Sequence, residues 1–194
     1  MKLASKSNKA REGHYPLHVD SNEGKDYIMD LNFCLEFALE NRKSMVKRAI
    51  EVIKKTCLGD IIEDSLINRN HNHAQFKDGL WIHRKGATHA EYGMMGVIPG
   101  NMRDGSFIVK GKGNPDSLCS SSHGAGRVLS RKEAKATLTL DVFEDTMSHI
   151  KAKVTEGTLD ESPHAYKNIF DVMELQKDLV EVITLVKPLI NIKA

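Results

Sequence analysis

The most constraining part of the sequence is a run of small residues around one histidine. His123 follows three serines and precedes the Gly–Ala–Gly of residues 124–126, and Arg127 and Arg131 come next. Small side chains let backbone amides approach an anion closely, and glycine permits the tight turn that this approach requires. An imidazole nitrogen can also form a covalent intermediate. The run therefore predicts a phosphate-binding turn with His123 as a candidate nucleophile.

The two arginines that follow the turn are four residues apart. This spacing would place both side chains on one face of a helix. A guanidinium has a planar fork of donors that matches the oxygens of a phosphate group. We therefore expect Arg127 and Arg131 to lie on a shared helix face and to bind phosphate together.

Length and composition favour a soluble globular chain. The 194 residues suffice for one sizeable core, and hydrophobic and charged contents of 40% and 28% are ordinary for such proteins. A net charge of +2 does not by itself demand nucleic acid, so any preference for phosphate must be local. The three cysteines, Cys34, Cys57 and Cys119, show no CxxC spacing, which predicts reduced thiols and a cytoplasmic setting. Neither a signal peptide nor a membrane span is evident, so we expect no membrane partner.

Hydrophobic periodicity predicts both helices and strands. Apolar residues recur at steps of three and four from Asp26 to Cys57, which predicts one long helix that could break at Asn41 and Arg42. The other expected elements are a strand at 79–83, short glycine-separated strands over 93–114, an amphipathic helix at 171–180 and a β-branched strand at 182–194.

A second candidate site is the Asn–His–Asn–His run at 70–73. Imidazole suits a transition metal, and an adjacent asparagine can bind a nucleotide oxygen. Two histidines are a weak metal signal, so a polar turn is the alternative interpretation. Residues 84–88 place two cations beside a glycine turn and are a further candidate phosphate contact. The usual nucleotide fingerprints, GxxxxGKS/T and a GxGxxG that opens a helix, are absent.

Together these runs resemble the RtcB family of RNA-splicing ligases. The Ser–Ser–Ser–His–Gly–Ala–Gly–Arg run is similar to the nucleophile motif of that family. The other similar segments occur in the family's order and cover nearly the whole chain: the helical run at 27–42, His71–Asn72, residues 83–87, residues 98–102, residues 106–111, and the terminal strand with its penultimate Lys193.

The resemblance implies a GTP- and manganese-dependent ligase that joins an RNA 3′-phosphate or 2′,3′-cyclic phosphate end to a 5′-hydroxyl end, as in tRNA splicing or RNA repair. His123 would attack the α-phosphate of GTP and carry GMP, His71 would bind Mn²⁺, and Arg127 and Arg131 would bind RNA phosphate. The residues implied at the nucleotide are His71, Asn72, Pro99, Gly100, Asn101, Met102, Ser106, His123, Gly124, Ala125, Gly126, Tyr166 and Lys193.

The chain also departs from the family pattern. Family members are longer, and their N-terminal half carries the acidic residue, the cysteine and the two histidines that complete the manganese site. One histidine does not hold a catalytic metal with useful affinity. We therefore expect a C-terminal half that needs a separately encoded N-terminal half for activity. The alternatives are an inactive RNA- or nucleotide-binding remnant and, from another class, a manganese-dependent phosphatase or nuclease that reuses the site.

The fold class that we expect is α+β. It would be a single domain over residues 1–194, with mixed short strands around a nucleotide site and helices packed outside. A half-chain of this kind would leave a large apolar face exposed unless a partner covers it.

Overall fold

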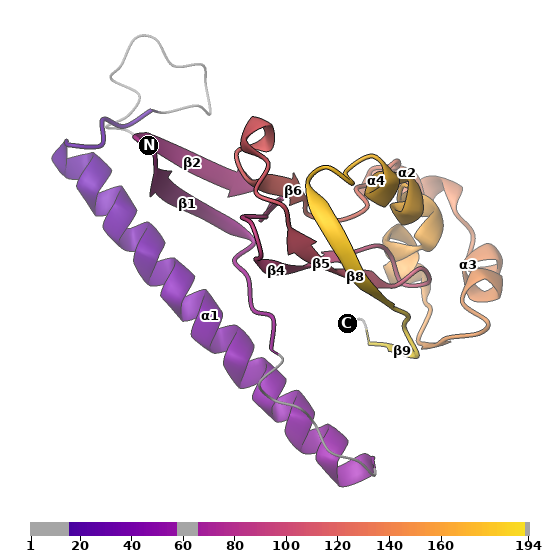
Figure 1. Cartoon of the computed structure of the whole chain (residues 1–194). Helices are drawn as coiled ribbons and strands as arrows, with labels where there is room; N and C mark the ends of the chain where they lie inside the picture. Colours follow the sequence, from indigo (N-terminus) through magenta and orange to yellow (C-terminus); the bar gives the residue numbers. More distant parts are fainter. Residues whose placement is uncertain (1–15, 58–65, 193–194) are drawn as a thin grey trace. The chain divides into compact units, whose positions relative to one another are not determined.

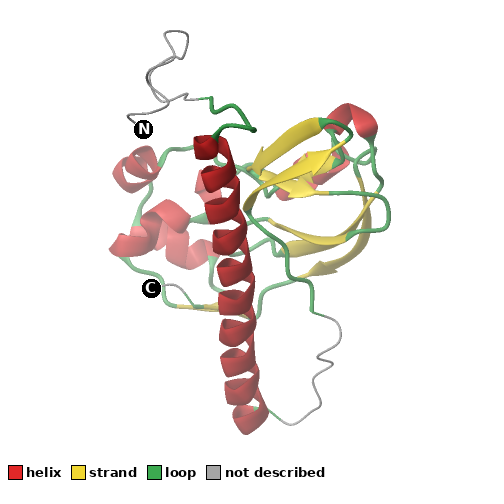
Figure 2. Ribbon diagram, turned by 90° about the vertical axis from the view of Figure 1, so that its left-hand side faces the viewer, coloured by secondary structure: helices red, strands yellow, loops and turns green. Residues whose placement is uncertain are grey.

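The computed structural model describes residues 16–57 and 66–192. The chain divides into two compact units, Met1–Glu63 and Asp64–Ala194. The expectation of one domain over residues 1–194 stays a prediction. The mixture of helices with short, mostly antiparallel strands (Figures 1 and 2) confirms the α+β class.

The described part of the first unit is dominated by helix α1, Asn22–Thr56, which runs for 35 residues without a break at Asn41 or Arg42. It begins four residues before the predicted start because Ser21 caps it. The Ser21 hydroxyl accepts a hydrogen bond from the Gly24 amide at 3.0 Å, which satisfies one of the free donors of the first turn. A local cap, which periodicity does not register, therefore sets the start of the helix.

Helix α1 exposes a stripe of large apolar side chains. Met29, Phe33 and Phe37 follow one another at intervals of four residues and are 64%, 69% and 64% exposed. Residues at this spacing share one face of a helix. Among the described residues of α1, Gly24 alone is buried. This stripe is an apolar surface that α1 does not itself cover.

The described part of the second unit is built from small sheets. The largest is antiparallel, in the order β4 (Met95–Pro99), β5 (Ser106–Gly111) and β8 (Val180–Val186). The others pair β1 (Asn72–Lys77) with β2 (Leu80–Lys85), β3 (Ala87–His89) with β6 (Ser120–Ser122), and β7 (Lys151–Ala152) with β9 (Ile190–Asn191). The helices are short: α2 (Arg131–Thr137), α3 (Leu140–Thr146) and α4 (Ile169–Glu174), with the 3₁₀ turns η3 (Pro115–Ser117), η4 (Glu156–Glu161) and η5 (Pro163–Ala165). Figure 1 shows α2, α3 and α4 at the end of this unit that is far from β1 and β2.

Two separate clusters of buried side chains form the core of the second unit over residues 66–192. The first joins the β4–β5–β8 sheet to α4 through Ala90, Ile98, Phe107, Val109, Ala125, Ile169, Met173 and Val180. The second lies around α3 and η4 and consists of Met102, Phe143, Met147 and Leu159. The first cluster therefore holds the largest sheet and α4 together, and the second holds α3 and η4.

Two predictions about the C-terminal part are wrong in their bounds. The helix predicted at 171–180 is α4, which ends at Glu174, because the chain then turns at buried Gln176 and enters β8 at Val180. The single strand predicted at 182–194 is divided into β8 and β9 within the described residues. Pro188 lies between them, and a proline cannot donate to a strand ladder. The strands predicted within 79–83 and 93–114 are confirmed as β2, β4 and β5.

An ionic contact ties β1 to the segment after β3. The Lys77 ammonium lies 2.7 Å from Glu91 Oε1, and His89 Nε2 lies 3.1 Å from the same oxygen. The hydrogen bond from Lys77, followed by the one from His89, lowers the pKa of Glu91 to about 2 from an ordinary value of 4.5. A carboxylate with a depressed pKa stabilises the fold above its unfolded pKa, and this stability is lost as the pH falls through the folded pKa.

Glu91→Gln is expected to lower the free energy of unfolding by about 1 kcal/mol at pH 7, the size of a charged hydrogen bond that solvent partly screens. The difference from wild type should shrink as the pH falls from 4.5 towards 2, because wild-type Glu91 then loses its own charge. Urea unfolding at several pH values measures this. Glu181→Gln, at an exposed position of β8, is the control. A difference that is independent of pH would show that the charge of Glu91 has no part in stability.

Candidate nucleotide-binding site

Two sets of contacts made by the preceding residue, Ser122, fix the position of His123. Ser122 ends β6 and pairs with Ala87 of β3. Its amide donates to Gln176 Oε1 at 2.9 Å, and Gln176 Nε2 donates back to the Ser122 hydroxyl at 2.9 Å. Gln176 is buried, so this clamp is shielded from water. A strand ladder and a distant side chain thus present His123 at the end of β6.

The turn after His123 needs its small residues. The Ala125 amide donates to the Pro99 carbonyl at 3.1 Å, which brings the turn against the end of β4. A Cβ on Gly124 would lie 2.9 Å from the same carbonyl oxygen, too close for any side chain. Gly126 has a φ of 73°, a conformation that favours glycine. The tight turn predicted from the sequence is therefore present, and one backbone hydrogen bond joins it to β4.

His71 and His123 lie against each other although 52 residues separate them in the sequence. Their ring centroids are 4.1 Å apart and their planes meet at 86°. His71 Nδ1 is 2.7 Å from Asn72 Oδ1. Because an amide oxygen only accepts, His71 Nδ1 is the donor of this hydrogen bond, and Nε2 is not part of it. Burial, and then the charge of His71, lowers the pKa of His123, so its imidazole is neutral at neutral pH and has a lone pair for nucleophilic attack.

A pocket of about 500 Å³ opens beside His123. This volume is within the range of small-molecule sites. Its lining includes nine of the residues implied at the nucleotide: Pro99, Gly100, Asn101, Met102, His123, Gly124, Ala125, Gly126 and Tyr166. Gly86, from the 84–88 segment proposed as a phosphate contact, also lines it, and the residues that sequence reasoning missed are Ser122, Glu161 and Asn191. The structure thus assembles one pocket from segments that are far apart in the sequence.

The remaining predicted contacts lie elsewhere. Ser106 pairs with Pro99 across β4 and β5 but does not line the pocket. His71 and Asn72 are outside the lining and reach the site through the contact of His71 with His123. Lys193 lies outside the described residues. The roles assigned to these four residues stay predictions.

Both core clusters hold the walls of the pocket. Ala125 belongs to the first cluster and Met102 to the second. Asn191 Nδ2 donates to the Met102 carbonyl at 2.8 Å, which ties β9 to the loop after β4. Asn101 Oδ1 accepts from the amide of Asp104 at 2.9 Å and so closes that loop. An asparagine three residues before an aspartate is a local turn signal, whereas no local pattern marks Asn191.

The prediction that Arg127 and Arg131 share a helix is wrong. Helix α2 begins only at Arg131, because Ser130 and Glu133 form a capping box in which each side chain accepts from the backbone amide of the other. Arg127 lies before this cap, in an extended segment that forms a β-bridge with Tyr166. The Ser–x–x–Glu pattern was visible in the sequence and would have placed the helix start.

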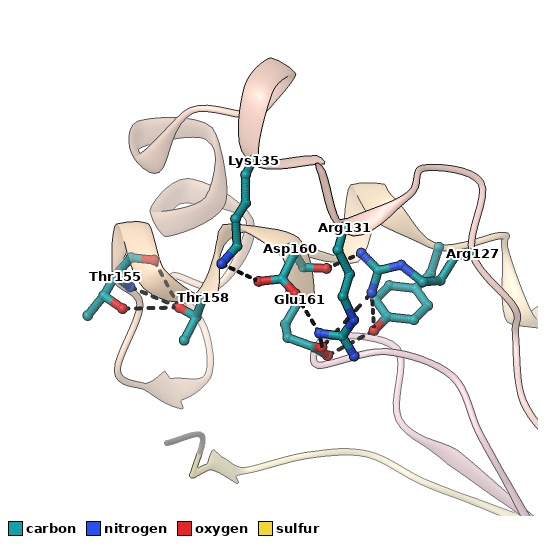
Figure 3. Close-up of polar contacts among 8 residues, drawn as sticks. Arg127, Arg131, Lys135, Thr155, Thr158, Asp160 and Glu161 are labelled. Atoms are coloured by element: carbon teal, nitrogen blue, oxygen red, sulfur yellow. Dashed lines mark hydrogen bonds and ion pairs between the residues drawn. The ribbon is translucent and has the colours of Figure 1, made fainter. Parts of the chain in front are cut away.

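The two arginines have different surroundings (Figure 3). Arg127 Nε donates to the Leu129 carbonyl at 3.0 Å, Nη1 donates to the Tyr166 hydroxyl at 2.9 Å, and Nη2 donates to the Asp160 carbonyl. Arg131 uses Nη1 alone, which lies 2.6 Å from Asp160 Oδ2 and 3.2 Å from Glu161 Oε1. That both bind RNA phosphate stays a prediction.

Comparison with known proteins shows the family. Residues 4–194 match the family described as tRNA-splicing ligase RtcB. The chain belongs to the RtcB family. It is 36% identical over 177 residues to the RNA-splicing ligase RtcB of Escherichia coli, an overlap that covers 87% of this chain and 43% of the relative.

Two archaeal relatives match in the same way. The tRNA-splicing ligase RtcB of Nanoarchaeum equitans is 29% identical over 190 residues, which are 82% of this chain and 40% of the relative. The tRNA-splicing ligase RtcB of Archaeoglobus fulgidus is 30% identical over 187 residues, which are 81% of this chain and 39% of the relative. This RtcB-family chain therefore spans less than half the length of the curated relatives that it matches.

The described residues of this RtcB-family chain do not form a manganese site on their own. Within residues 16–57 and 66–192, no three His, Cys, Asp or Glu side chains come together as ligands for a metal ion. His71 offers one imidazole nitrogen, and a second histidine pair, His73 and His89, lies beside buried Arg84, whose charge opposes a cation. In the same ranges, no helix is both long and apolar enough to cross a membrane.

Gly124→Ala is expected to weaken nucleotide binding about tenfold or more, equivalent to at least 1.4 kcal/mol. The new methyl group would push the His123 turn away from the Pro99 carbonyl, which is backbone and cannot rotate aside. Calorimetric titration with GMP and GTP measures the loss. Gly157→Ala is the matched control, because its Cβ would meet only Thr155 Oγ1 at an ordinary 3.6 Å. Unchanged affinity in Gly124→Ala would show that the nucleotide does not occupy this turn.

Proposed function

We propose that this RtcB-family chain is the C-terminal, nucleotide-carrying half of a GTP-dependent RNA ligase. The observation that carries the proposal is the pocket, in which His123, with its neutral imidazole, lies together with eight other residues implied at the nucleotide. In the first step, a lone pair of His123 would form a bond to the α-phosphorus of GTP. The bond between that phosphorus and the β-bridging oxygen would break, and pyrophosphate would leave with the electron pair.

The second part of the proposal concerns RNA. The histidine-bound GMP would be passed to an RNA 3′-phosphate, and a 5′-hydroxyl would then displace GMP to form the new phosphodiester. A 2′,3′-cyclic phosphate would first be opened by water. The backbone amides of the 124–126 turn and the nearby Arg131 are groups of this chain that can stabilise phosphate charge. Such ends are produced when an RNA strand is cut during splicing or damage.

In this proposal, Mn²⁺ would be bound only when a complement supplies further ligands. His71, whose Nε2 is not part of the bond to Asn72, would contribute one ligand. When bound, the ion supplies charge neutralisation of the triphosphate. The remaining donors are expected on the part of the relatives that this chain does not match, since the chain spans 43% of the Escherichia coli relative.

Exposed apolar residues support the need for a complement. The α1 stripe of Met29, Phe33 and Phe37 is uncovered within the first unit, and Ile190 and Ile192 are exposed at the end of the second. Large apolar patches on a soluble protein mark surfaces that bind other proteins. The three cysteines are free thiols, which fits a reducing compartment such as the cytoplasm.

One observation favours a second candidate function, an inactive nucleotide- and RNA-binding remnant. The described ranges 16–57 and 66–192 contain no set of three metal ligands, so a chain without a complement would keep the pocket and lack the metal. Such a protein would bind GMP and RNA in a salt-dependent manner and would join no ends.

The deciding experiment is complementation. The chain would be mixed with a polypeptide that corresponds to the unmatched part of the Escherichia coli relative, together with α-labelled GTP, Mn²⁺ and RNA with 3′-phosphate and 5′-hydroxyl ends. We expect an acid-labile label on this chain, unaffected by excess ATP, and joined RNA. Binding of the complement without a label or joined RNA would reject the ligase and leave the remnant.

A further inference from the structure

Three cations gather around two adjacent carboxylates on η4, next to the pocket. Arg127, Arg131 and Lys135 contact Asp160 and Glu161 (Figure 3). The side chain of Asp160 is only 7% exposed, so a carboxylate is buried here at the cost of its hydration and is balanced by cations. Asp160 accepts from Arg131 at 2.6 Å and lies 3.5 Å from the Lys135 ammonium. The cluster is therefore a fixed part of the fold and the anchor of α2.

Within this cluster, Arg127 is a poor candidate for binding phosphate. Each of its three nitrogens donates a hydrogen bond to the protein, and its side chain is 23% exposed. A phosphate that took one of these bonded N–H groups would leave a carbonyl or the Tyr166 hydroxyl without its donor, which is costly for a buried acceptor. The bonds that Arg127 makes join its own segment to Asp160 and to Tyr166, so its role in the fold is structural.

The contacts of Arg127 hold two residues that line the pocket. The Arg127 guanidinium carbon lies 4.8 Å above the ring of Tyr166 while Nη1 donates to the Tyr166 hydroxyl. That hydroxyl donates in turn to Glu161 Oε2 at 2.8 Å. Tyr166 and Glu161 both line the pocket, and Arg127 does not. Any influence of Arg127 on a bound nucleotide therefore passes through Tyr166 and Glu161.

Arg131 has the opposite arrangement. Its side chain is 70% exposed, and Nη1 alone makes the contacts to Asp160 and Glu161. Nε and Nη2 make no hydrogen bond to any residue in the described ranges. A guanidinium that is anchored at one nitrogen keeps its orientation and still offers two other nitrogens as donors, which reduces the entropy lost when it binds a phosphate.

We propose that Arg127 is a positioning residue that holds Tyr166 and Glu161 against the nucleotide pocket and does not itself bind RNA phosphate. Arg131, anchored on Asp160, keeps the phosphate contact that the resemblance implies for both arginines. The Arg131 part rests on the proposed function, because it requires an RNA substrate. The Arg127 part requires only that a guanine nucleotide binds in the pocket.

The Arg131 part is tested with a single-stranded RNA that ends in a 3′-phosphate, titrated over a series of salt concentrations. Arg131→Met is expected to lower affinity at low salt and to reduce the slope of log K against log salt by about 0.7, the value for one phosphate contact on single-stranded RNA. Lys132→Met removes the same charge from the neighbouring exposed position of α2 and should leave the slope unchanged. Equal slopes for Arg131→Met and wild type would overturn this part.

The Arg127 part is tested by a double-mutant cycle on GMP affinity, measured well below the thermal midpoint of each variant. Arg127→Met and Tyr166→Phe are each expected to weaken GMP binding about five- to tenfold, and the double variant should be no weaker than either, because both break one chain of contacts. Arg127→Met should keep the RNA salt slope of wild type. Additive losses of GMP affinity, or a reduced salt slope in Arg127→Met, would overturn the positioning role.

The two kinds of failure are distinguishable. If wild type shows no salt-dependent RNA binding, the ligase proposal and the task of Arg131 fall together, while the cycle on GMP still decides the role of Arg127. If wild type binds RNA and GMP but both arginine variants reduce the salt slope, the ligase proposal stands and the division of tasks is wrong.

Discussion

His123→Gln is expected to abolish the GMP label on this chain, a loss on the order of 10³-fold or more, as for removal of a catalytic nucleophile. Glutamine has a similar reach and can keep a hydrogen bond to its surroundings, but its amide nitrogen has no lone pair available for attack at phosphorus. The pocket walls do not depend on this side chain, since the Gln176 clamp holds Ser122 and the Ala125–Pro99 bond holds the turn. GMP affinity should therefore change little while labelling disappears.

His164→Gln is the matched control for this experiment. His164 is exposed, its Nε2 lies 3.0 Å from the Thr146 hydroxyl, and it is not part of the pocket lining. The variant should be labelled like wild type in the complementation mixture. Residual labelling of His123→Gln would mean that another side chain carries GMP, and His71, whose ring contacts His123, would be the first to examine.

Phe143→Ala is expected to have the largest effect on stability, about 3–5 kcal/mol of unfolding free energy, as for other fully buried aromatic residues. Phe143 is 0% exposed at the centre of the second cluster, against Met102, Met147 and Leu159. Met102 lines the pocket, so the cavity left by the ring would loosen that wall. Urea denaturation followed by circular dichroism measures the loss, and GMP titration should show weaker binding.

Val142→Ala, one position earlier on α3 and 49% exposed, provides the comparison. A loss below about 1 kcal/mol is expected there, because little apolar area leaves water at this position. A comparable loss at both positions would show that burial of Phe143 in the second cluster is not what stabilises this unit.

Local signals in the sequence were sufficient for the parts of the site that lie close together in the chain. The serines and glycines around His123 predicted the tight turn, and apolar periodicity predicted α1, because each of these depends on neighbours within a few residues. The shared helix of Arg127 and Arg131 was wrong because spacing alone was used, and spacing says nothing about where a helix begins. The capping box at Ser130 does.

Contacts across long sequence distances were not predictable in this way. Gln176 and Asn191 reach back 54 and 89 residues to Ser122 and Met102. Nothing in the residues around them distinguishes them from other polar residues in turns. Glu161 likewise lies in a 3₁₀ turn, and only the folded chain shows that its carboxylate faces the pocket beside Tyr166.

The pocket lining extends from Gly86 to Asn191, almost to the end of the described chain. During translation, a ribosome must release nearly all of the second unit before Asn191 can bond to Met102 and the last wall can close. A nascent chain stopped before β9 would display His123 without a complete pocket around it. The proposed binding of a nucleotide would therefore require that synthesis of this unit had reached β9.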